Sequence, residues 1–225
     1  MLRAVFFDID DTLLDFNRCA VKATRESFRR FSLTPPKNTM EVFFRINDAL
    51  WLQIERGELT AAEHRRIRWN RIFAALGIDF DGELFEEEFR RHLTECCELV
   101  DGALEVLRAL SPRYLLCAAS NAADAVSQRH RLTKAGLLPL LDHCFLSGEL
   151  GCSKPSPQFF ASCFASLSGI RPEETLMVGD SPHADMAGGK AFGMHTCLLD
   201  PKNNHPHCKE ADHTVRSLRE VLEIL

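Results

Sequence analysis

The sequence lacks the features expected of a protein that works in a membrane or on a nucleic acid. No apolar stretch approaches the length needed to span a bilayer, and no long run of basic residues occurs. The net charge of −5 argues against general binding to nucleic acids or to anionic membrane surfaces. A single phosphorylated small molecule is not excluded, because it needs only local positive charge. We therefore expect no nucleic acid polymer and no membrane as partner.

Cysteine is present but shows no pattern. The nine cysteines are an odd number, they are scattered, and none has C-x-x-C spacing. No signal-peptide pattern precedes the first predicted strand. These features are typical of free thiols in a reducing compartment, so we expect a cytoplasmic protein.

Residues 16–98 show four successive helical patterns and no convincing strand. The predicted helices cover 18–31, 39–56, 60–76 and 82–98. Thr60 and Glu63 have the spacing of a capping box, while Gly57 and Gly77 end the helices before them. Four antiparallel helices can bury a core of their own. We therefore predict a helical domain over residues 16–98, inserted after the first strand.

Strands and helices alternate in the rest of the chain. The predicted strands cover 2–7, 114–119, 143–146, 175–178, 195–199 and 213–215. The predicted helices cover 103–110, 124–135, 158–167 and 183–192, with a terminal helix after Ser217. Such alternation is typical of a parallel sheet with helices on both faces. We predict an α/β protein with a Rossmann-like sheet, formed by residues 1–15 and 99–225.

The first predicted strand ends abruptly in acids. The apolar run from Val5 to Phe7 is followed by Asp8, Asp10 and Asp11. At the carboxyl end of a buried parallel strand, these acids stand where open α/β sheets bind ligands. Carboxylates two residues apart repel each other, and a divalent cation such as Mg²⁺ compensates. The alternative is a solvated turn after the strand.

Three later connections add polar groups that should meet at the same edge of the sheet. They are Ser120-Asn121, Ser153-Lys154-Pro155 and the segment from Asp180 to Asp185. A metal held by the acids, with Lys and Ser facing it, would bind a phosphoryl group. In the alternative interpretation, Ser120 simply ends a strand and Asn121 caps the next helix.

These segments resemble, in order, the four motifs of the haloacid dehalogenase (HAD) superfamily. The motifs are Asp8-Ile9-Asp10-Asp11-Thr12, Ser120, Lys154-Pro155 and Gly179-Asp180-Ser181-Pro182-His183-Ala184-Asp185. The resemblance covers the whole chain, since the inserted helices match the C1-type helical cap of that family. It implies an α/β core with a cap domain and an enzyme that uses Mg²⁺.

The resemblance implies a role for each matching residue. Asp8 would be the nucleophile that forms an aspartyl-phosphate. Asp10 would protonate the leaving group and then activate water. Asp8, the Asp10 backbone carbonyl and Asp180 would hold Mg²⁺. Ser120 and Lys154 would bind the phosphoryl oxygens.

The same resemblance implies supporting roles for further residues. Asp185, beside Ser181, would orient Lys154 or a metal-bound water. Asn121 is a further candidate for phosphate binding. Asp11 and Thr12 would shape the turn.

The presence of Asp10 favours phosphate-ester hydrolysis, because dehalogenation releases no alkoxide that needs a proton. The Asp15-Phe16 junction, the segment Gly57–Thr60 and Arg68-Trp69 resemble the pyrimidine 5′-nucleotidase branch. Sugar-phosphate, N-acylneuraminate-9-phosphate and phosphoglycolate phosphatases are alternatives. A phosphomutase, a 2-haloacid dehalogenase and a non-catalytic binding protein are weaker ones.

Three other features admit two interpretations each. Arg68 lies in line with apolar residues of its helix, so it would either touch substrate or cover apolar surface with its stem. The histidines around His205-Pro206-His207-Cys208 suggest zinc, but their spacing fits a surface loop better. Gly188-Gly189 indicates close packing of a helix on the sheet rather than catalysis. The sequence leaves the oligomeric state open.

Overall fold

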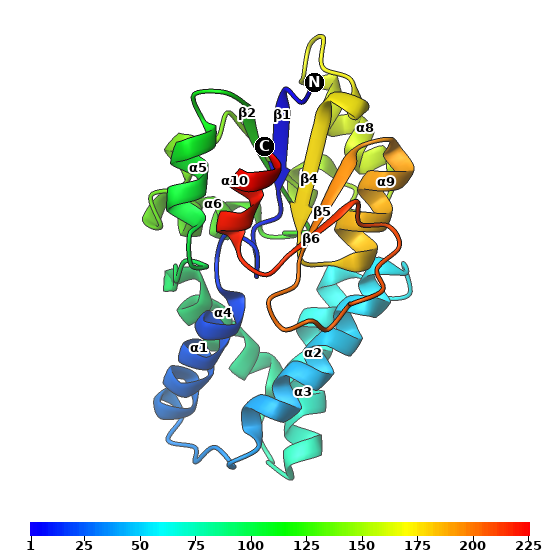
Figure 1. The fold of residues 1–225 in the computed structure, drawn as a ribbon. Helices are drawn as coiled ribbons and strands as arrows, with labels where there is room; N and C mark the ends of the chain where they lie inside the picture. The colour runs from blue at the N-terminus through cyan, green and yellow to red at the C-terminus, as the bar shows by residue number, and fades with distance from the viewer. The chain divides into compact units, whose positions relative to one another are not determined.

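The structure, a computed structural model, describes residues 1–225 and divides the chain into two compact units. One unit comprises Met1–Phe16 and Cys97–Leu225, and the other comprises Asn17–Cys96. Figure 1 shows the sheet of the first unit and the helices of the second.

The first unit is built on a parallel sheet of six strands in the order β3-β2-β1-β4-β5-β6. The strands are β1 (Ala4–Phe7), β2 (Leu115–Ser120), β3 (His143–Leu146), β4 (Thr175–Gly179), β5 (His195–Leu199) and β6 (His213–Val215). β1 lies between β2 and β4, with Phe7 aligned to Ala118 and Val178. The predicted parallel α/β sheet is confirmed.

Helices cover both faces of this sheet (Figure 1). They are α5 (Ala103–Leu110), α6 (Ala125–Lys134), α7 (Ser147–Leu150), α8 (Pro157–Ala165), α9 (Gly188–Phe192) and α10 (Val221–Ile224). Side chains alternate along a strand, so Val5 and Phe7 join the core under α5, while Ala4 and Phe6 join the core under α8. The short α7 was not predicted, because four residues carry no readable periodicity.

The segment after β4 differs from its prediction. In place of one helix over 183–192, a π-helix covers Pro182–Ala187 and α9 follows it. The N–H groups of Asp185 and Met186 both donate to the Ser181 carbonyl, each at 3.2 Å. Such π-turns frequently occur at functional sites.

The two glycines of α9 make close contacts, as predicted. A Cβ atom on Gly189 would lie 3.3 Å from the Met177 Cβ of β4. A Cβ atom on Gly188 would lie 2.9 Å from the Pro155 Cα. A side chain at position 188 would therefore clash with backbone, whereas one at position 189 would require only a small shift of its neighbours.

The second unit contains the helices α2, α3, α4 and nearly all of α1. Their bounds are α1 (Phe16–Arg30), α2 (Thr39–Glu55), α3 (Ala61–Leu76) and α4 (Gly82–Glu95). The core is aromatic and fully buried, formed by Phe28, Phe43, Trp69, Phe73, Phe85 and Phe89. The predicted capping box is present, since Thr60 and Glu63 exchange hydrogen bonds of 2.8 and 3.2 Å.

None of the helices in either unit combines the length and the hydropathy that a bilayer-spanning segment requires. All nine cysteines are free thiols.

Candidate active site

Three adjacent strands, β2, β1 and β4, carry predicted site residues at their carboxyl ends. Asp8 follows β1 directly, Ser120 is the last residue of β2, and Asp180 follows β4. The Asp8 N–H donates to the Val178 carbonyl at 2.9 Å, which continues the β1–β4 pairing into the site. The register of the sheet therefore determines which polar groups meet.

A tight turn follows Asp8. The N–H groups of Leu13 and Leu14 both donate to the Ile9 carbonyl at 2.8 Å, and the Asp11 N–H donates to the Leu14 carbonyl at 2.7 Å. Asp11 has a φ of 58°, which short polar side chains tolerate better than most. These bonds fix the backbone on both sides of Asp10.

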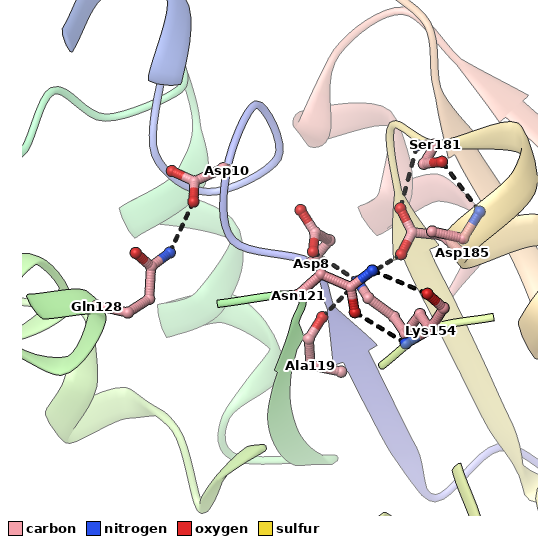
Figure 2. A network of polar contacts seen from close by, with 9 residues as sticks. Asp8, Asp10, Ala119, Asn121, Gln128, Lys154, Ser181 and Asp185 are labelled. Atoms are coloured by element: carbon pink, nitrogen blue, oxygen red, sulfur yellow. Dashed lines mark hydrogen bonds and ion pairs between the residues drawn. The ribbon is translucent and has the colours of Figure 1, made fainter. Parts of the chain in front are cut away.

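Lys154 lies at the centre of the site and is 1% exposed. Its Nζ donates to Asp8 Oδ1, Asp185 Oδ1 and the Ala119 carbonyl, each at 2.6 Å (Figure 2). These three bonds use all three donors of the ammonium group. Asp8 and Asp185, far apart in the sequence, therefore share one cation.

Asn121 holds Lys154 by its backbone. The Asn121 amide oxygen accepts the Lys154 N–H at 2.8 Å, and its amide nitrogen donates to the Lys154 carbonyl at 2.9 Å. The helix cap considered for Asn121 belongs instead to Asp124, whose side chain accepts the Ser127 N–H at 3.1 Å. Asn121 therefore supports Lys154 through its backbone, and its contact with phosphate stays a prediction.

Asp185 has both carboxylate oxygens engaged. Oδ1 accepts from Lys154, and Oδ2 accepts the Ser181 N–H at 3.1 Å. The Ser181 hydroxyl in turn accepts the Ala184 N–H at 3.0 Å, which begins the π-helix. The π-helix thus aims Asp185 at Lys154 (Figure 2).

The electrostatics of this cluster are those of crowded acids. Burial raises the pKa of Asp8 to about 7, and the carboxylate of Asp185 contributes in the same direction. Burial also raises the pKa of Asp180 well above its ordinary value, helped by the charges of Asp8 and Asp185. Burial disfavours the Lys154 ammonium, but the two carboxylates beside it outweigh this effect and raise the pKa of Lys154.

The site has the donors that a divalent cation prefers. Asp8, Asp180 and Asp185 are the one set of three or more Asp, Glu, His or Cys residues whose ligand atoms all lie within 4.8 Å of one another. Three carboxylates face one ammonium, so negative charge remains, and oxygen donors suit Mg²⁺. Because both Asp185 oxygens are engaged, Asp8 and Asp180 are the acids with oxygens to offer. The residues present therefore fit a magnesium ion.

Asp10 lies apart from the lysine cluster, and its side chain points toward α6 (Figure 2). Gln128 Nε2 donates to Asp10 Oδ2 at 2.9 Å, and Arg131 Nη1 donates to Asp10 Oδ1 at 2.7 Å. Neither Gln128 nor Arg131 was predicted from the sequence. Helical periodicity contains no signal for a partner more than a hundred residues away.

The model of the haloacid dehalogenase-like hydrolase family matches residues 2–193. The chain belongs to this family. The predicted family and the predicted class of enzyme, a HAD-type hydrolase, are confirmed.

Individual relatives of this HAD hydrolase align over almost the whole chain. YfnB of Bacillus subtilis, named as a HAD-hydrolase, is 33% identical over 99% of this chain and 95% of its own. The pyrimidine 5′-nucleotidase PynA of Streptococcus pneumoniae is 29% identical over 98% of this chain and 94% of its own. The pyrimidine 5′-nucleotidase YjjG of Escherichia coli is 27% identical over 98% of this chain and 96% of its own.

A crystal structure of YfnB bound to magnesium has the same fold as this HAD hydrolase. The TM-score is 0.92 at 31% identity, over 100% of this chain and 98% of that one.

Arg68 of the HAD hydrolase has a different place from the predicted substrate contact. It lies inside the helical unit and is 4% exposed. Its guanidinium donates to Glu86 at 2.6 and 3.0 Å and to Asn47 Oδ1 at 3.0 Å, and it stacks on Phe89 at 4.8 Å from the ring centre. Its donors thus serve the core of the unit, which corrects the predicted substrate role.

The histidine-rich segment near the end of the chain forms a surface loop, as the sequence favoured. His205 and His207 are exposed, and no acid, histidine or cysteine of this loop belongs to a metal-binding group. Asp200 holds the loop by accepting the N–H groups of Asn204 and His205, each at 2.8 Å.

Proposed function

We propose that this HAD hydrolase is a Mg²⁺-dependent phosphomonoesterase that acts on a small phosphorylated metabolite through an aspartyl-phosphate. The observation that carries the proposal is the contact of Lys154 Nζ with Asp8 Oδ1 at 2.6 Å in a buried acidic site. An ammonium beside a carboxylate nucleophile can bind the oxygens of the phosphoryl group that the carboxylate attacks.

In the first step, an oxygen of Asp8 attacks the phosphorus of the ester. The Asp8–phosphorus bond forms while the bond from phosphorus to the ester oxygen breaks. Asp10, protonated for this step, gives its proton to the departing oxygen and becomes a carboxylate. The alcohol then leaves.

In the second step, the Asp10 carboxylate takes a proton from water, and the water oxygen attacks phosphorus. The Asp8–phosphorus bond breaks, and Asp8 is restored as inorganic phosphate leaves. Asp10 is again protonated and ready for the next ester.

In this scheme Ser120 binds one phosphoryl oxygen, and Lys154 exchanges its bond to Asp8 for a bond to another phosphoryl oxygen as Asp8 attacks. Asp185 and Asn121 keep Lys154 in place. Asp8, Asp180 and the Asp10 backbone carbonyl would hold Mg²⁺. When bound, the ion supplies positive charge that neutralises the phosphoryl oxygens and the carboxylate nucleophile.

The two units take the roles of core and cap in this proposal. Residues 1–15 and 99–225 supply the chemistry, and residues 16–98 form the cap that selects the leaving group.

A nucleoside 5′-monophosphate is the first candidate substrate. PynA and YjjG, named as pyrimidine 5′-nucleotidases, align with 98% of this chain and support it. Sugar phosphates, N-acylneuraminate 9-phosphate and phosphoglycolate follow as alternatives. A 2-haloacid is disfavoured, because dehalogenation gives the proton chemistry of Asp10 no task.

The deciding experiment measures hydrolysis of p-nitrophenyl phosphate with Mg²⁺ and with EDTA. We expect turnover only with Mg²⁺, and none in an Asp8→Asn variant, which keeps the shape of the side chain. Turnover in EDTA or in the variant would contradict the mechanism. A protein that only binds phosphate would show no turnover at all. Asp180→Asn should need more Mg²⁺ than the wild type for half-maximal rate.

A panel of nucleoside monophosphates, sugar phosphates and phosphoglycolate then identifies the substrate class by kcat/KM. A preference for pyrimidine nucleoside monophosphates supports the first candidate. Preference for another ester rejects it and retains the phosphatase.

A further inference from the structure

Helix α6 binds the proposed acid and base, Asp10, with two side chains on one face. Gln128 and Arg131 are three residues apart on the helix and therefore lie side by side. Gln128 Nε2 donates to Asp10 Oδ2 at 2.9 Å, and Arg131 Nη1 donates to Asp10 Oδ1 at 2.7 Å. We propose that Gln128 and Arg131 are positioning residues that aim the Asp10 carboxylate for proton transfer. This inference rests on the proposed function of Asp10.

The contact is a closed triangle. Arg131 Nη1 also donates to Gln128 Oε1 at 3.0 Å. Because the amide oxygen of Gln128 faces the arginine, its nitrogen faces Asp10, so Arg131 determines the direction of both donors. Each oxygen of Asp10 is thereby bound by a different donor, and the plane of the carboxylate is fixed.

These contacts are not needed to form the turn that carries Asp10. The backbone of that turn is held by its own bonds from Leu13 and Leu14 to the Ile9 carbonyl and from Asp11 to the Leu14 carbonyl. What remains to be fixed is the side chain of Asp10, and that is the part that α6 binds.

Gln128 and Arg131 are buried, so their polar groups destabilise the fold unless they form hydrogen bonds. Gln128 is 5% exposed and Arg131 is 2% exposed, although both side chains are long and polar. Burying such groups is unfavourable without hydrogen-bond partners. The Asp10 side chain, by contrast, is 34% exposed, so it is within reach of an ester or a water molecule.

The arrangement leaves Asp10 able to exchange protons. A carboxylate has about four lone-pair sites, and the two donors occupy one on each oxygen. The remaining sites can accept a proton from water and return it to a leaving oxygen. Misdirecting the carboxylate should therefore slow proton transfer without changing Asp8 or Lys154.

If Gln128 and Arg131 have this role, the effect of replacing them on kcat/KM should depend on the leaving group of the ester. A poor leaving group needs the proton, while p-nitrophenolate leaves almost without it. The two probes are phenyl phosphate and p-nitrophenyl phosphate, which share an aryl shape and differ in leaving-group basicity. The constant kcat/KM reports the first irreversible step, where Asp10 would act as the acid.

The variants are Gln128→Glu, which keeps the shape and removes the donor, Gln128→Ala, and Arg131→Lys. Arg129→Ala is the matched control, because Arg129 of α6 binds Glu149 at 2.8 Å and forms no hydrogen bond or ion pair with Asp10. We expect kcat/KM for phenyl phosphate to fall about tenfold or more in the Gln128 variants, within the range of general acid catalysis. For p-nitrophenyl phosphate the fall should be less than about threefold.

Arg131→Lys keeps a positive charge beside Asp10 and should therefore retain part of the wild-type kcat/KM for phenyl phosphate. Arg129→Ala should leave the ratio of the two kcat/KM values unchanged. An unchanged ratio in both Gln128 variants, with an active wild type, would overturn this inference and leave the proposed function intact. If the wild type shows no Mg²⁺-dependent turnover of either ester, the proposed function fails and this inference fails with it.

Discussion

Gly179 packs so closely against Asp185 that a Cβ atom at position 179 would lie 2.8 Å from the Asp185 Cβ. Gly179 is the last residue of β4, and Asp185 is in the π-helix that follows. The absence of a side chain at one position therefore allows the carboxylate at the other to reach Lys154. This contact, the buried Lys154, the Arg68–Glu86 pair and the buried His64 each lead to a testable prediction.

Gly179→Ala should displace Asp185 from Lys154. Forcing extra atoms into a packed site typically costs about 1–3 kcal/mol of stability. We expect kcat/KM for p-nitrophenyl phosphate to fall at least about tenfold, because Lys154 loses one of its two carboxylate partners. Gly189→Ala is the control, since its Cβ would meet Met177 at a milder 3.3 Å. Equal activity in the two variants would contradict the argument.

Lys154→Met should leave Asp8 and Asp185 facing each other without a cation. Removing one partner of a buried ion pair lowers the free energy of unfolding by about 3–5 kcal/mol, which urea unfolding measures. The value of kcat/KM should fall at least about a hundredfold. Lys190→Met removes the exposed ion pair with Asp212 and should cost at most about 1 kcal/mol with activity retained. A Lys154 variant as active as that control would refute the proposed role.

Arg68 and Glu86 should behave as a coupled pair inside the helical unit. Both are 4% exposed, and burial raises the pKa of Glu86 while Arg68 opposes that shift. Arg68→Met leaves Glu86 buried without its cation and should cost about 3–5 kcal/mol. Replacing both residues with Met should cost much less, because no charge then stays buried. Tryptophan fluorescence during urea unfolding reports this unit, since both tryptophans, Trp51 and Trp69, lie in it. If the double variant lost as much free energy of unfolding as the single replacements of Arg68 and Glu86 added together, the two residues would not be coupled.

His64 should make the helical unit less stable in acid. Burial, assisted by the charges of Arg68 and Arg65, lowers the pKa of His64 from 6.5 to about 3. Between these values the unfolded chain binds a proton that the folded chain does not, so stability falls as the pH drops through 6.5 and the loss levels off near pH 3. From pH 7 to pH 5 this group alone should remove about 2 kcal/mol.

The measurement is the free energy of unfolding in urea of the wild type and of His64→Leu at the two pH values. The difference in free energy of unfolding between the two proteins should change by about 2 kcal/mol from pH 7 to pH 5. Carboxylates titrate in both proteins, so this difference reports His64 alone. His205→Leu, an exposed histidine, is the matched control. A difference that does not change with pH would contradict the assignment to His64.

Local patterns predicted several elements with their bounds. The strands over 143–146, 195–199 and 213–215 and the helix over 103–110 have the predicted limits in the structure. Each is a short apolar pattern between turn residues, so its limits depend on neighbouring residues alone. The π-helix was missed because one extra residue in a single turn leaves no signal in a short helical pattern.

Side-chain partners were predicted less well than elements. Asn121 stands where a phosphate ligand was expected, yet its amide binds the backbone of Lys154. Arg68 stands on a partly apolar helix face, yet the acid that binds it comes from another helix. Helical periodicity identifies a buried face but not the residue that meets it.

The resemblance of four motifs indicated the family, and the alternation of strand and helix patterns predicted the parallel α/β fold, because both are properties of short segments of the chain. The contacts of Lys154 with Asp8 and Asp185, and of Gln128 and Arg131 with Asp10, are visible only in the folded chain. Those pairs are separated by 31 to 146 residues along the chain. Their contacts depend on strand register and helix orientation, which the packing of the whole core determines.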